Sequence, residues 1–565
     1  MGAVISVGKQ SFQSLRENGY FYIDKTNFIK EWWEAGDEVT LITRPRRFGK
    51  TLNMNMLECF FSLKYKERSD LFEGLSIWKE EKYRKLQGTY PVIFLSFASV
   101  KARNLADAKT QIKMQIANLY EEHRFLLSGD LLSDNEKEWF QKITSEPEDV
   151  LAANAINRLC VFLNRYYNKK TIVLLDEYDT PMQEAYLGGY WDEFTEFIRN
   201  MFNATFKTNP NLERGIMTGI TRVSKESIFS DLNNPKVITT TSEEYATCFG
   251  FTENEVFASL DNIGLSERKQ DVKEWYDGFT FGTHEDIYIP WSITNFLDEK
   301  KLKAYWASTS SNGLINMLLQ SSSSEIKKKM EKLLQGNSIT VEIDEQIIFN
   351  QLDEDEDAIW SLMLASGYLK VDKVKYQDEY GEELDEPVYS LSITNKEVRS
   401  MFVKMFKGWF KMTSSNYNGF VSALLKGNVK EMNIYMNEVA LATFSSFDTG
   451  KHPSQKTQPE RFYHGFVLGL LVELRGKYEV FSNGESGYGR YDVMLCPLKE
   501  NEPAIVLEFK VYDPDEEKSL KDTVDAALLQ IDEMKYDTKL LERGIKSENI
   551  RHYGFAFEGK KVLIG

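Results

Sequence analysis

Two short polar stretches carry the residue types that bind phosphate and metal ions. The first, Gly49-Lys50-Thr51, follows the β-branched run Val39–Thr43 and opens a segment of helical character, Thr51–Phe60. Glycine lets the backbone approach an anion, and N–H groups at a helix start point toward phosphate oxygens. Lysine supplies a point charge for the outer phosphates, and a threonine hydroxyl can ligate Mg²⁺. A strand, this loop and a helix predict a phosphate-binding loop.

The loop departs from the general phosphate-binding pattern at its first position. The pattern G-x-x-x-x-G-K-[ST] requires glycine at position 44, and this chain has Arg44 there. Together with Arg46 and Arg47, Arg44 is expected to add three positive charges beside Lys50. The alternative interpretation is a basic surface turn that leads into a helix.

The second stretch, Thr171–Pro181, reads TIVLLDEYDTP. Its first five residues are apolar or β-branched, which is typical of a strand buried on both faces. Acids at the carboxyl end of such a strand lie where a parallel sheet binds its ligand. Asp176 is expected to hold Mg²⁺ through water, and Glu177 to polarise the attacking water as a general base. An acidic loop after a core strand is the alternative, but both stretches together favour a nucleotide site.

Further strands are expected between helical segments. Apolar runs at Pro91–Ala98, Arg214–Thr221 and Lys236–Thr241 alternate with helical patterns. This alternation predicts a doubly wound parallel sheet. Arg222, just after one of these strands, is a candidate for sensing the outer phosphate, and its alternative is an ordinary surface arginine.

A second candidate site lies near the C-terminus. Glu508 and Lys510 are two residues apart on the predicted strand Ala504–Lys510, so their side chains point the same way. Asp492 lies on the preceding predicted strand, Arg490–Cys496. Metal-dependent phosphodiesterases gather two carboxylates and an ammonium in this way, and the carboxylates hold Mg²⁺ or Mn²⁺. The alternative is a hairpin with solvated charges, although a carboxylate within the apolar run AIVLEF requires a partner.

Composition restricts the class of protein. The chain has 565 residues, is 42% hydrophobic and carries a net charge of −17, which disfavours indiscriminate binding to polyanions. Its four cysteines are far apart and form no C-x-x-C motif, so neither a zinc site nor a disulfide framework is indicated. No signal peptide and no membrane span are predicted. A soluble, reducing, cytoplasmic setting is therefore expected.

Longer motifs give a resemblance to known families. Val4–Phe296 contains FYIDKT, TRPRRFGKT and LLDEYD, and it resembles the bacterial AAA-ATPase-like family, in which the Arg44 substitution is in keeping. Gln458–Gly565 resembles the PD-(D/E)XK nuclease domain commonly fused to it. The resemblance implies that Lys50 and Thr51 bind nucleotide phosphates and Mg²⁺, and that Asp176 and Glu177 serve the metal and the water. The candidate nucleotide-binding residues of the chain are Arg47, Phe48, Gly49, Lys50, Thr51, Leu52, Asp176 and Arg222, with Thr51 and Asp176 as the candidate metal ligands.

For the nuclease-like segment, the resemblance implies a centre that spans several elements. Asp492 and Glu508 would bind the metal there, beside Lys510. The first acid of such centres usually lies on the preceding helix, and Glu460, with His464 four residues on, fits that place. Gln530 and Tyr536 resemble a helical motif that some of these nucleases add. The candidate catalytic residues of the chain are therefore Glu177, Glu460, Asp492, Glu508, Lys510 and Gln530.

The predicted fold is α/β with three domains. Residues 1–297 form a P-loop NTPase domain with a parallel sheet, residues 298–455 a mostly helical, winged-helix-like connection, and residues 456–565 a PD-(D/E)XK nuclease-like domain. In the connection, the strands Tyr368–Lys375 and Val388–Thr394 flank an acidic loop, which favours a protein contact over DNA binding.

The predicted function is that of an ATP-binding and ATP-hydrolysing protein whose nucleotide state regulates a metal-dependent nuclease acting on DNA or RNA. Its cofactors are ATP and Mg²⁺, with Mn²⁺ as an option at the nuclease site. The alternative is a nucleotide-switched binding protein with an inactive nuclease-like domain. ATP versus GTP, the identity of the nucleic acid, and a homo-oligomer or protein partner are left open.

Overall fold

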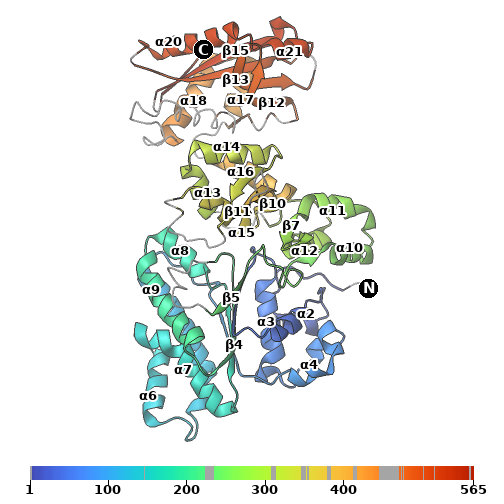
Figure 1. Cartoon of the computed structure of the whole chain (residues 1–565), viewed down its shortest axis with the longest axis vertical. Helices are drawn as coiled ribbons and strands as arrows, with labels where there is room; N and C mark the ends of the chain where they lie inside the picture. The colour runs from blue at the N-terminus through green and yellow to red at the C-terminus, as the bar shows by residue number, and fades with distance from the viewer. Residues whose placement is uncertain are drawn as a thin grey trace. The chain divides into compact units, whose positions relative to one another are not determined.

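A computed structural model describes the chain (Figure 1). It covers residues 3–565 except 146, 223–233, 307–312, 345–351, 353–354, 378–382, 412–416, 444–466, 468–469, 472–473, 475, 500–501, 515 and 559–560. The chain divides into two compact units, Met1–Leu318 with Gly336–Arg399, and Leu319–Gln335 with Ser400–Gly565. The boundaries of these two units differ from those of the three predicted domains, and the three-domain division remains a prediction.

The first unit is built on a five-stranded parallel sheet, which confirms the predicted α/β class. Its strands are β1 (Val39–Thr43), β2 (Val92–Ser96), β3 (Thr171–Asp176), β4 (Leu212–Gly219) and β5 (Pro235–Ile238). Their spatial order is β2-β3-β4-β1-β5. Because all five strands run parallel, the carboxyl ends of β1, β3 and β4 meet at the same edge of the sheet. Strand β4 therefore separates the two strands whose loops carry the predicted chemistry.

Helices cover both faces of this sheet, as a doubly wound fold requires (Figure 1). One face carries α2 (Asn27–Ala35), α3 (Lys50–Phe61) and α4 (Glu81–Leu86). The other carries α7 (Asp149–Tyr167), α8 (Thr180–Gly188) and α9 (Trp191–Phe202). The remaining helices of this part are α1 (Phe12–Glu17), α5 (Leu105–Glu122) and α6 (Asp134–Ser145). Strands β1 and β3 are buried along their whole length, as their continuous apolar runs predicted.

A small antiparallel sheet, not predicted from the sequence, packs against the phosphate-binding loop. It consists of β6 (Phe251–Thr252), β7 (Phe279–Phe281) and β8 (His284–Tyr288), in the order β6-β8-β7. Three helices accompany it: α10 (Glu253–Asn262), α11 (Lys269–Tyr276) and α12 (Pro290–Glu299). The ring of Phe48 in the loop lies 4.7 Å from that of Phe279, between ring centroids. The small sheet thus holds one end of the loop in place.

The following segment contains the two predicted strands as a hairpin, with a helix on either side of it in the sequence. They are α15 (Ala358–Ala365), the β10–β11 hairpin (Leu369–Gln377 and Glu383–Ile393) and α16 (Lys396–Lys411). A third strand, β9 (Ile339–Glu342), pairs with β11, and α13 (Gly313–Ser321) and α14 (Ser324–Leu334) precede it. The centre of the acidic loop, residues 378–382, lies outside the described residues.

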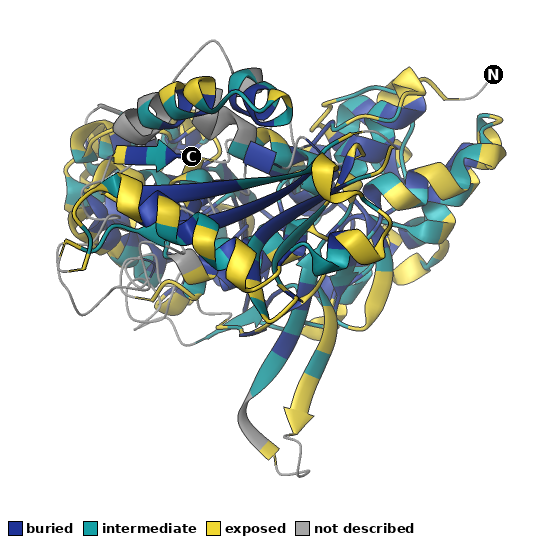
Figure 2. Cartoon of the chain, turned by 90° about the horizontal axis from the view of Figure 1, so that it is seen from above, coloured by how far each residue is buried: buried dark blue, intermediate teal, exposed yellow. Residues whose placement is uncertain are grey.

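The second unit contains a mixed five-stranded sheet, consistent with the predicted C-terminal α/β domain. Its strands, in spatial order, are β12 (Tyr478–Ser486), β13 (Gly489–Pro497), β14 (Ala504–Val511), β15 (Ile550–Glu558) and β16 (Lys561–Ile564). The β14–β15 pair is parallel and the other pairs are antiparallel. Strands β13, β14 and β15 are largely buried, the dark blue in Figure 2. Four helices accompany this sheet among the described residues: α17 (Tyr417–Lys426), α18 (Val429–Thr443), α20 (Leu520–Glu533) and α21 (Thr538–Glu542).

None of the helices in the described part of the chain has the length and apolar character needed to cross a membrane.

Candidate functional site

The phosphate-binding loop places Lys50 at the start of helix α3. Gly49 precedes the helix in the left-handed region, with φ at 82°, a conformation that favours glycine. The Lys50 side chain is almost fully buried, and its Nζ donates to the carbonyls of Arg44 and Pro45, each at 2.9 Å. Burial lowers the pKa of this ammonium, while nearby carboxylates oppose the change. An anion entering the loop would provide a charged partner in place of two neutral carbonyls.

The two predicted stretches meet at Asp176. Its carboxylate accepts from the Thr51 hydroxyl at 2.8 Å, from the Thr218 hydroxyl at 2.7 Å and from the Ser96 hydroxyl at 3.3 Å. Asp176 is fully buried, and burial raises the pKa of its carboxyl group. The hydroxyls of Thr218 and Ser96 were not singled out from the sequence. The sequence pattern that could have identified them is a polar residue near the carboxyl end of an otherwise apolar strand.

Two more acids follow Asp176 in the chain. Glu177 lines the cavity described below, and its backbone is in the left-handed region with φ at 51°, a strained conformation for this residue. Asp179 is fully buried, and its Oδ2 accepts from the backbone N–H groups of Ile220 at 2.8 Å and Thr221 at 2.9 Å. Sequence reasoning gave Asp179 no role. The carboxylate joins the loop after β3 to the turn after β4.

The three arginines of the loop do not act together around Lys50. Arg44 is fully buried, and its guanidinium donates to the carbonyls of Thr43, Thr239 and Glu244. It also lies 4.5 Å from the centre of the Phe281 ring. Burial lowers the pKa of Arg44 to about 10. Arg44 is therefore part of the core, which corrects the expectation of a third positive charge beside Lys50.

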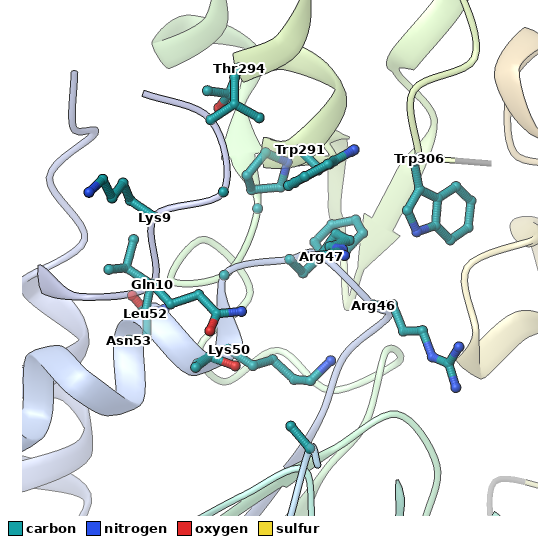
Figure 3. Close-up of a pocket in the computed structure, with 18 of the residues that line it drawn as sticks. Lys9, Gln10, Arg46, Arg47, Lys50, Leu52, Asn53, Trp291, Thr294 and Trp306 are labelled. Atoms are coloured by element: carbon teal, nitrogen blue, oxygen red, sulfur yellow. The ribbon is translucent and has the colours of Figure 1, made fainter. Parts of the chain in front are cut away.

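Arg46 and Arg47 point to different neighbours. The Arg46 guanidinium donates to the side chain of Gln183 at 3.0 Å. Arg47 has a left-handed backbone with φ at 68°, and its guanidinium lies 4.3 Å from the centre of the Trp291 ring (Figure 3). Trp291 belongs to helix α12, so this stacking connects the loop to the small-sheet region.

A cavity of about 440 Å³ extends from the phosphate-binding loop. The predicted residues Arg47, Phe48, Gly49, Lys50, Thr51, Leu52 and Glu177 line it. At its other end are the N-terminal segment 6–10 and Trp291 and Thr294 from α12 (Figure 3). Asp176 lies behind Thr51 rather than on the cavity wall, and Arg222 is not among the described residues that line it. The structure thus brings most, but not all, of the predicted nucleotide residues together.

The donor set of this site fits a nucleotide with Mg²⁺. Thr51 and Asp176 offer the hard oxygen ligands that Mg²⁺ prefers, and their side chains are already within hydrogen-bonding distance of each other. Backbone N–H groups at the start of α3 and the Lys50 ammonium suit phosphate oxygens. The volume lies in the range of small-molecule sites.

In the second unit, Asp492 and Glu508 lie on adjacent strands. Val493 of β13 pairs with Leu507 of β14, so Asp492 and Glu508 occupy the next positions along the two strands. The Asp492 Oδ2 accepts from the backbone N–H of Phe509 at 2.8 Å, and Glu508 is almost fully buried. Two carboxylates on one face of a sheet are suited to a divalent cation such as Mg²⁺ or Mn²⁺.

The helix α20 completes this arrangement with an amide. Gln530 donates through Nε2 to Glu508 Oε1 and, at 3.1 Å, to the Tyr536 hydroxyl. That hydroxyl donates in turn to the carbonyl of Arg490 at 2.7 Å, and burial raises its pKa. Lys510 is partly buried, two residues beyond Glu508 on the same strand. The remaining predicted residues of this centre, Glu460 and His464, lie outside the described residues.

The described residues also contain an acidic cluster that sequence reasoning did not identify. Oxygen atoms of Glu253, Asp277 and Asp286 lie within 4.8 Å of one another. The Lys273 ammonium contacts Glu253 at 2.5 Å and Asp286 at 3.1 Å. Burial raises the pKa of Asp277 to about 7. Because Lys273 balances part of this charge, we regard the cluster as an ion-pair network.

Comparisons with known proteins agree with the two-part organisation. A family model described as Predicted AAA-ATPase matches residues 6–229, and a model described as PD-(D/E)XK nuclease superfamily matches residues 458–565. A relative from Azotobacter chroococcum mcd 1, named as an uncharacterized protein in the vnfD 5′ region, is 24% identical over 399 residues. That alignment covers 70% of this chain and 68% of the relative.

Proposed function

Since this chain carries an AAA-ATPase-like domain over residues 6–229 and a PD-(D/E)XK nuclease superfamily domain over residues 458–565, we propose that it couples ATP hydrolysis to nucleic-acid cleavage. In this proposal the first unit binds ATP with Mg²⁺. Its nucleotide state regulates a metal-dependent nuclease centre in the second unit, which acts on DNA or RNA.

One observation carries the nucleotide part of the proposal: the loop at Lys50 and the acid at Asp176 converge, with Thr51 bonded directly to Asp176. Lys50 would exchange its two loop carbonyls for phosphate oxygens, which are better partners for an ammonium. Thr51 and Asp176 would hold Mg²⁺, which neutralises charge on the phosphates when bound. Glu177, at the cavity wall, would orient and deprotonate the attacking water.

The nuclease part rests on the neighbouring positions of Asp492 and Glu508. These carboxylates would hold Mg²⁺ or Mn²⁺, which lowers the pKa of bound water when present. Gln530 and the Tyr536 hydroxyl fix the orientation of Glu508 through a chain of hydrogen bonds. Lys510 would neutralise charge that develops on the phosphate or orient the water.

Calorimetry on the full chain tests the nucleotide site. We expect Mg·ATP analogue to bind to the wild-type protein, and Lys50→Ala to weaken binding by about 100-fold or more because a charged phosphate contact is lost. Glu177→Gln is expected to bind nucleotide but to hydrolyse ATP at least about 100-fold more slowly. The exposed Glu193→Gln, on α9, is the matched control. Wild-type protein that takes up no nucleotide would refute the proposal.

Cleavage assays test the nuclease centre. With DNA and RNA substrates and either Mg²⁺ or Mn²⁺, Asp492→Asn and Glu508→Gln should each abolish cleavage, because each removes a charged metal ligand. Glu485→Gln, at an exposed position on the neighbouring strand β12, should retain it. Cleavage that persists in both site variants would contradict the assignment.

The hydrogen bonds of Asp492 and Glu508 favour a second candidate function. Asp492 is engaged by a backbone N–H group and Glu508 by an amide, and among the described residues no third acid joins them in a metal-binding group. This arrangement suits a nucleotide-switched binding protein with an inactive nuclease-like domain. Isothermal titration with Mn²⁺ distinguishes the two functions. If the nuclease-like domain is active, Asp492→Asn should abolish Mn²⁺ binding that the wild-type protein shows. If it is inactive, the titration should give the same result for wild type and variant.

A further inference from the structure

A buried glutamate outside both candidate sites connects two walls of the nucleotide cavity. Glu397 is fully buried and lies in the first turn of helix α16. One carboxylate oxygen accepts from the Ser292 hydroxyl at 2.7 Å, and the other accepts from the backbone N–H of Trp306 at 2.6 Å. A buried carboxylate is costly unless it is hydrogen-bonded, so these contacts fix its position closely.

Both partners of Glu397 belong to segments that form the cavity. Ser292 follows Trp291 on helix α12, and Trp291 lines the cavity with its ring against Arg47. Trp306 itself lines the cavity (Figure 3). Each oxygen of one carboxylate therefore holds a different wall of the same cavity.

The second wall is also packed toward the phosphate-binding loop. The Trp306 ring lies 6.2 Å from the ring of Phe279, which in turn lies 4.7 Å from the ring of Phe48 in the loop, between ring centroids. A change at either the loop or the α12 wall therefore reaches an atom bonded to Glu397 through direct contacts.

The position of Glu397 in helix α16 determines what its displacement would affect. It begins at Lys396, the first unit ends at Arg399, and the same helix continues into the second unit as far as Lys411. A rigid helix that starts on a fixed carboxylate transmits a displacement of its first turn along its length. Glu397 is thus where the cavity walls are bonded to the first turn of helix α16.

We propose that Glu397 is a positioning residue that transmits nucleotide occupancy of the cavity to helix α16. The proposal rests on the proposed nucleotide binding and adds its route of regulation. Arg47 has two competing partners, the Trp291 ring in the present structure and a phosphate group when nucleotide is bound. Nucleotide therefore interacts more favourably with the arrangement in which Arg47 has left the Trp291 ring. Such a difference in interaction is what allows a ligand to shift a conformational equilibrium. Removing Arg47 from Trp291 changes the contacts of α12, and Ser292 passes the change to Glu397.

Hydrogen exchange of the full chain tests the proposal, with saturating Mg·ADP or a non-hydrolysable ATP analogue as the probe. In the wild-type protein, nucleotide should change the exchange rate of amides in α16 by about fivefold or more, the lower end of typical coupling. In Glu397→Gln, nucleotide should still bind, but the change in α16 should fall to less than about twofold, because the amide nitrogen cannot accept the hydrogen bond that the second carboxylate oxygen accepts. Ser292→Ala, which keeps the carboxylate, should reduce the change partially.

The matched control is Glu274→Gln. Glu274 pairs with Lys396 at the same helix start, but its side chain is 46% exposed, so this variant should respond like the wild type. An unchanged α16 response in both Glu397→Gln and Ser292→Ala would overturn the inference, as would a wild-type protein that binds nucleotide without any response in α16. Those two results would leave the nucleotide site intact. A wild-type protein that binds no nucleotide would refute the proposed function and the inference with it.

Discussion

Replacing Arg44 by glycine restores the general phosphate-loop pattern, and we expect it to harm the protein. The pattern uses glycine at this position so that the backbone can adopt its turn, but Arg44 is not among the residues with positive φ. Its side chain instead extends into the core, where it meets three carbonyl groups and the Phe281 ring. Arg44→Gly therefore removes core contacts and gains no backbone freedom that the loop needs.

The expected magnitude follows from these contacts. Three hydrogen bonds from a charged donor contribute about 1.5 kcal/mol each, or about 4 to 5 kcal/mol together. Burial that lowers the pKa of Arg44 to about 10, from 12.5, corresponds to about 3 kcal/mol that the variant would recover. The space left by the fully buried side chain costs about 2 kcal/mol more. The free energy of unfolding of the first unit should therefore fall by about 3 kcal/mol.

Thermal unfolding monitored by tryptophan fluorescence measures this loss as a fall in midpoint of about 5 °C or more. The control is Arg47→Gly in the same loop. Arg47 already has a positive φ, so glycine relieves strain there while losing the stacking on Trp291, and the midpoint should change by no more than about 2 °C. An Arg44→Gly protein with unchanged midpoint and tighter nucleotide binding would refute the reasoning.

Three further outcomes are expected. Asp179→Ala should lower the midpoint of the first unit by about 4 °C or more, because it leaves two buried backbone N–H groups without their acceptor, while Asp179→Asn should recover most of the loss. His552→Gln should destabilise the second unit at about pH 5.5 and have little effect at about pH 9, because the bond to Asp537 raises the pKa of His552 and its contribution is lost as pH rises through that value. Mg·ADP should raise the thermal midpoint of the wild type but not of Lys50→Ala.

A specific result would contradict each of these predictions. Equal midpoints for Asp179→Ala and wild type would show that the turn after β4 does not need its acceptor. A loss in His552→Gln that is the same at both pH values would mean that the imidazolium is not what stabilises the second unit; His284→Gln, at an exposed position, is its control. Stabilisation of Lys50→Ala by Mg·ADP would place the nucleotide elsewhere.

Much of the fold follows from local patterns in the sequence. The buried runs at Val39–Thr43 and Thr171–Asp176 are strands because continuous β-branched and aliphatic residues suit a sheet covered on both faces. The acid at the end of the second run predicted the convergence with the lysine loop, because parallel strands share one carboxyl edge. The α/β class was predicted from such patterns alone, and the structure confirms it.

What the sequence did not predict depends on contacts between distant residues. Arg44 resembles a surface charge in the sequence, and its burial requires carbonyls contributed by Thr239 and Glu244 from far along the chain. Glu397 has no neighbouring motif, and its role depends on Ser292 and Trp306 meeting it in space. Polar residues whose partners are this remote carry no local signal, so periodicity and spacing cannot identify them.

The division of the chain into two units has a consequence for its biosynthesis. Helix α14 belongs to the second unit, although residues of the first unit follow it in the sequence. Its apolar side chains Ile326, Met330 and Leu333 are buried in the finished protein, yet the rest of that unit leaves the ribosome only after Arg399. Helix α14 is therefore synthesised while the first unit is still being completed, ahead of most of its own unit. An uninterrupted fragment that contains all of one unit must therefore also contain a piece of the other.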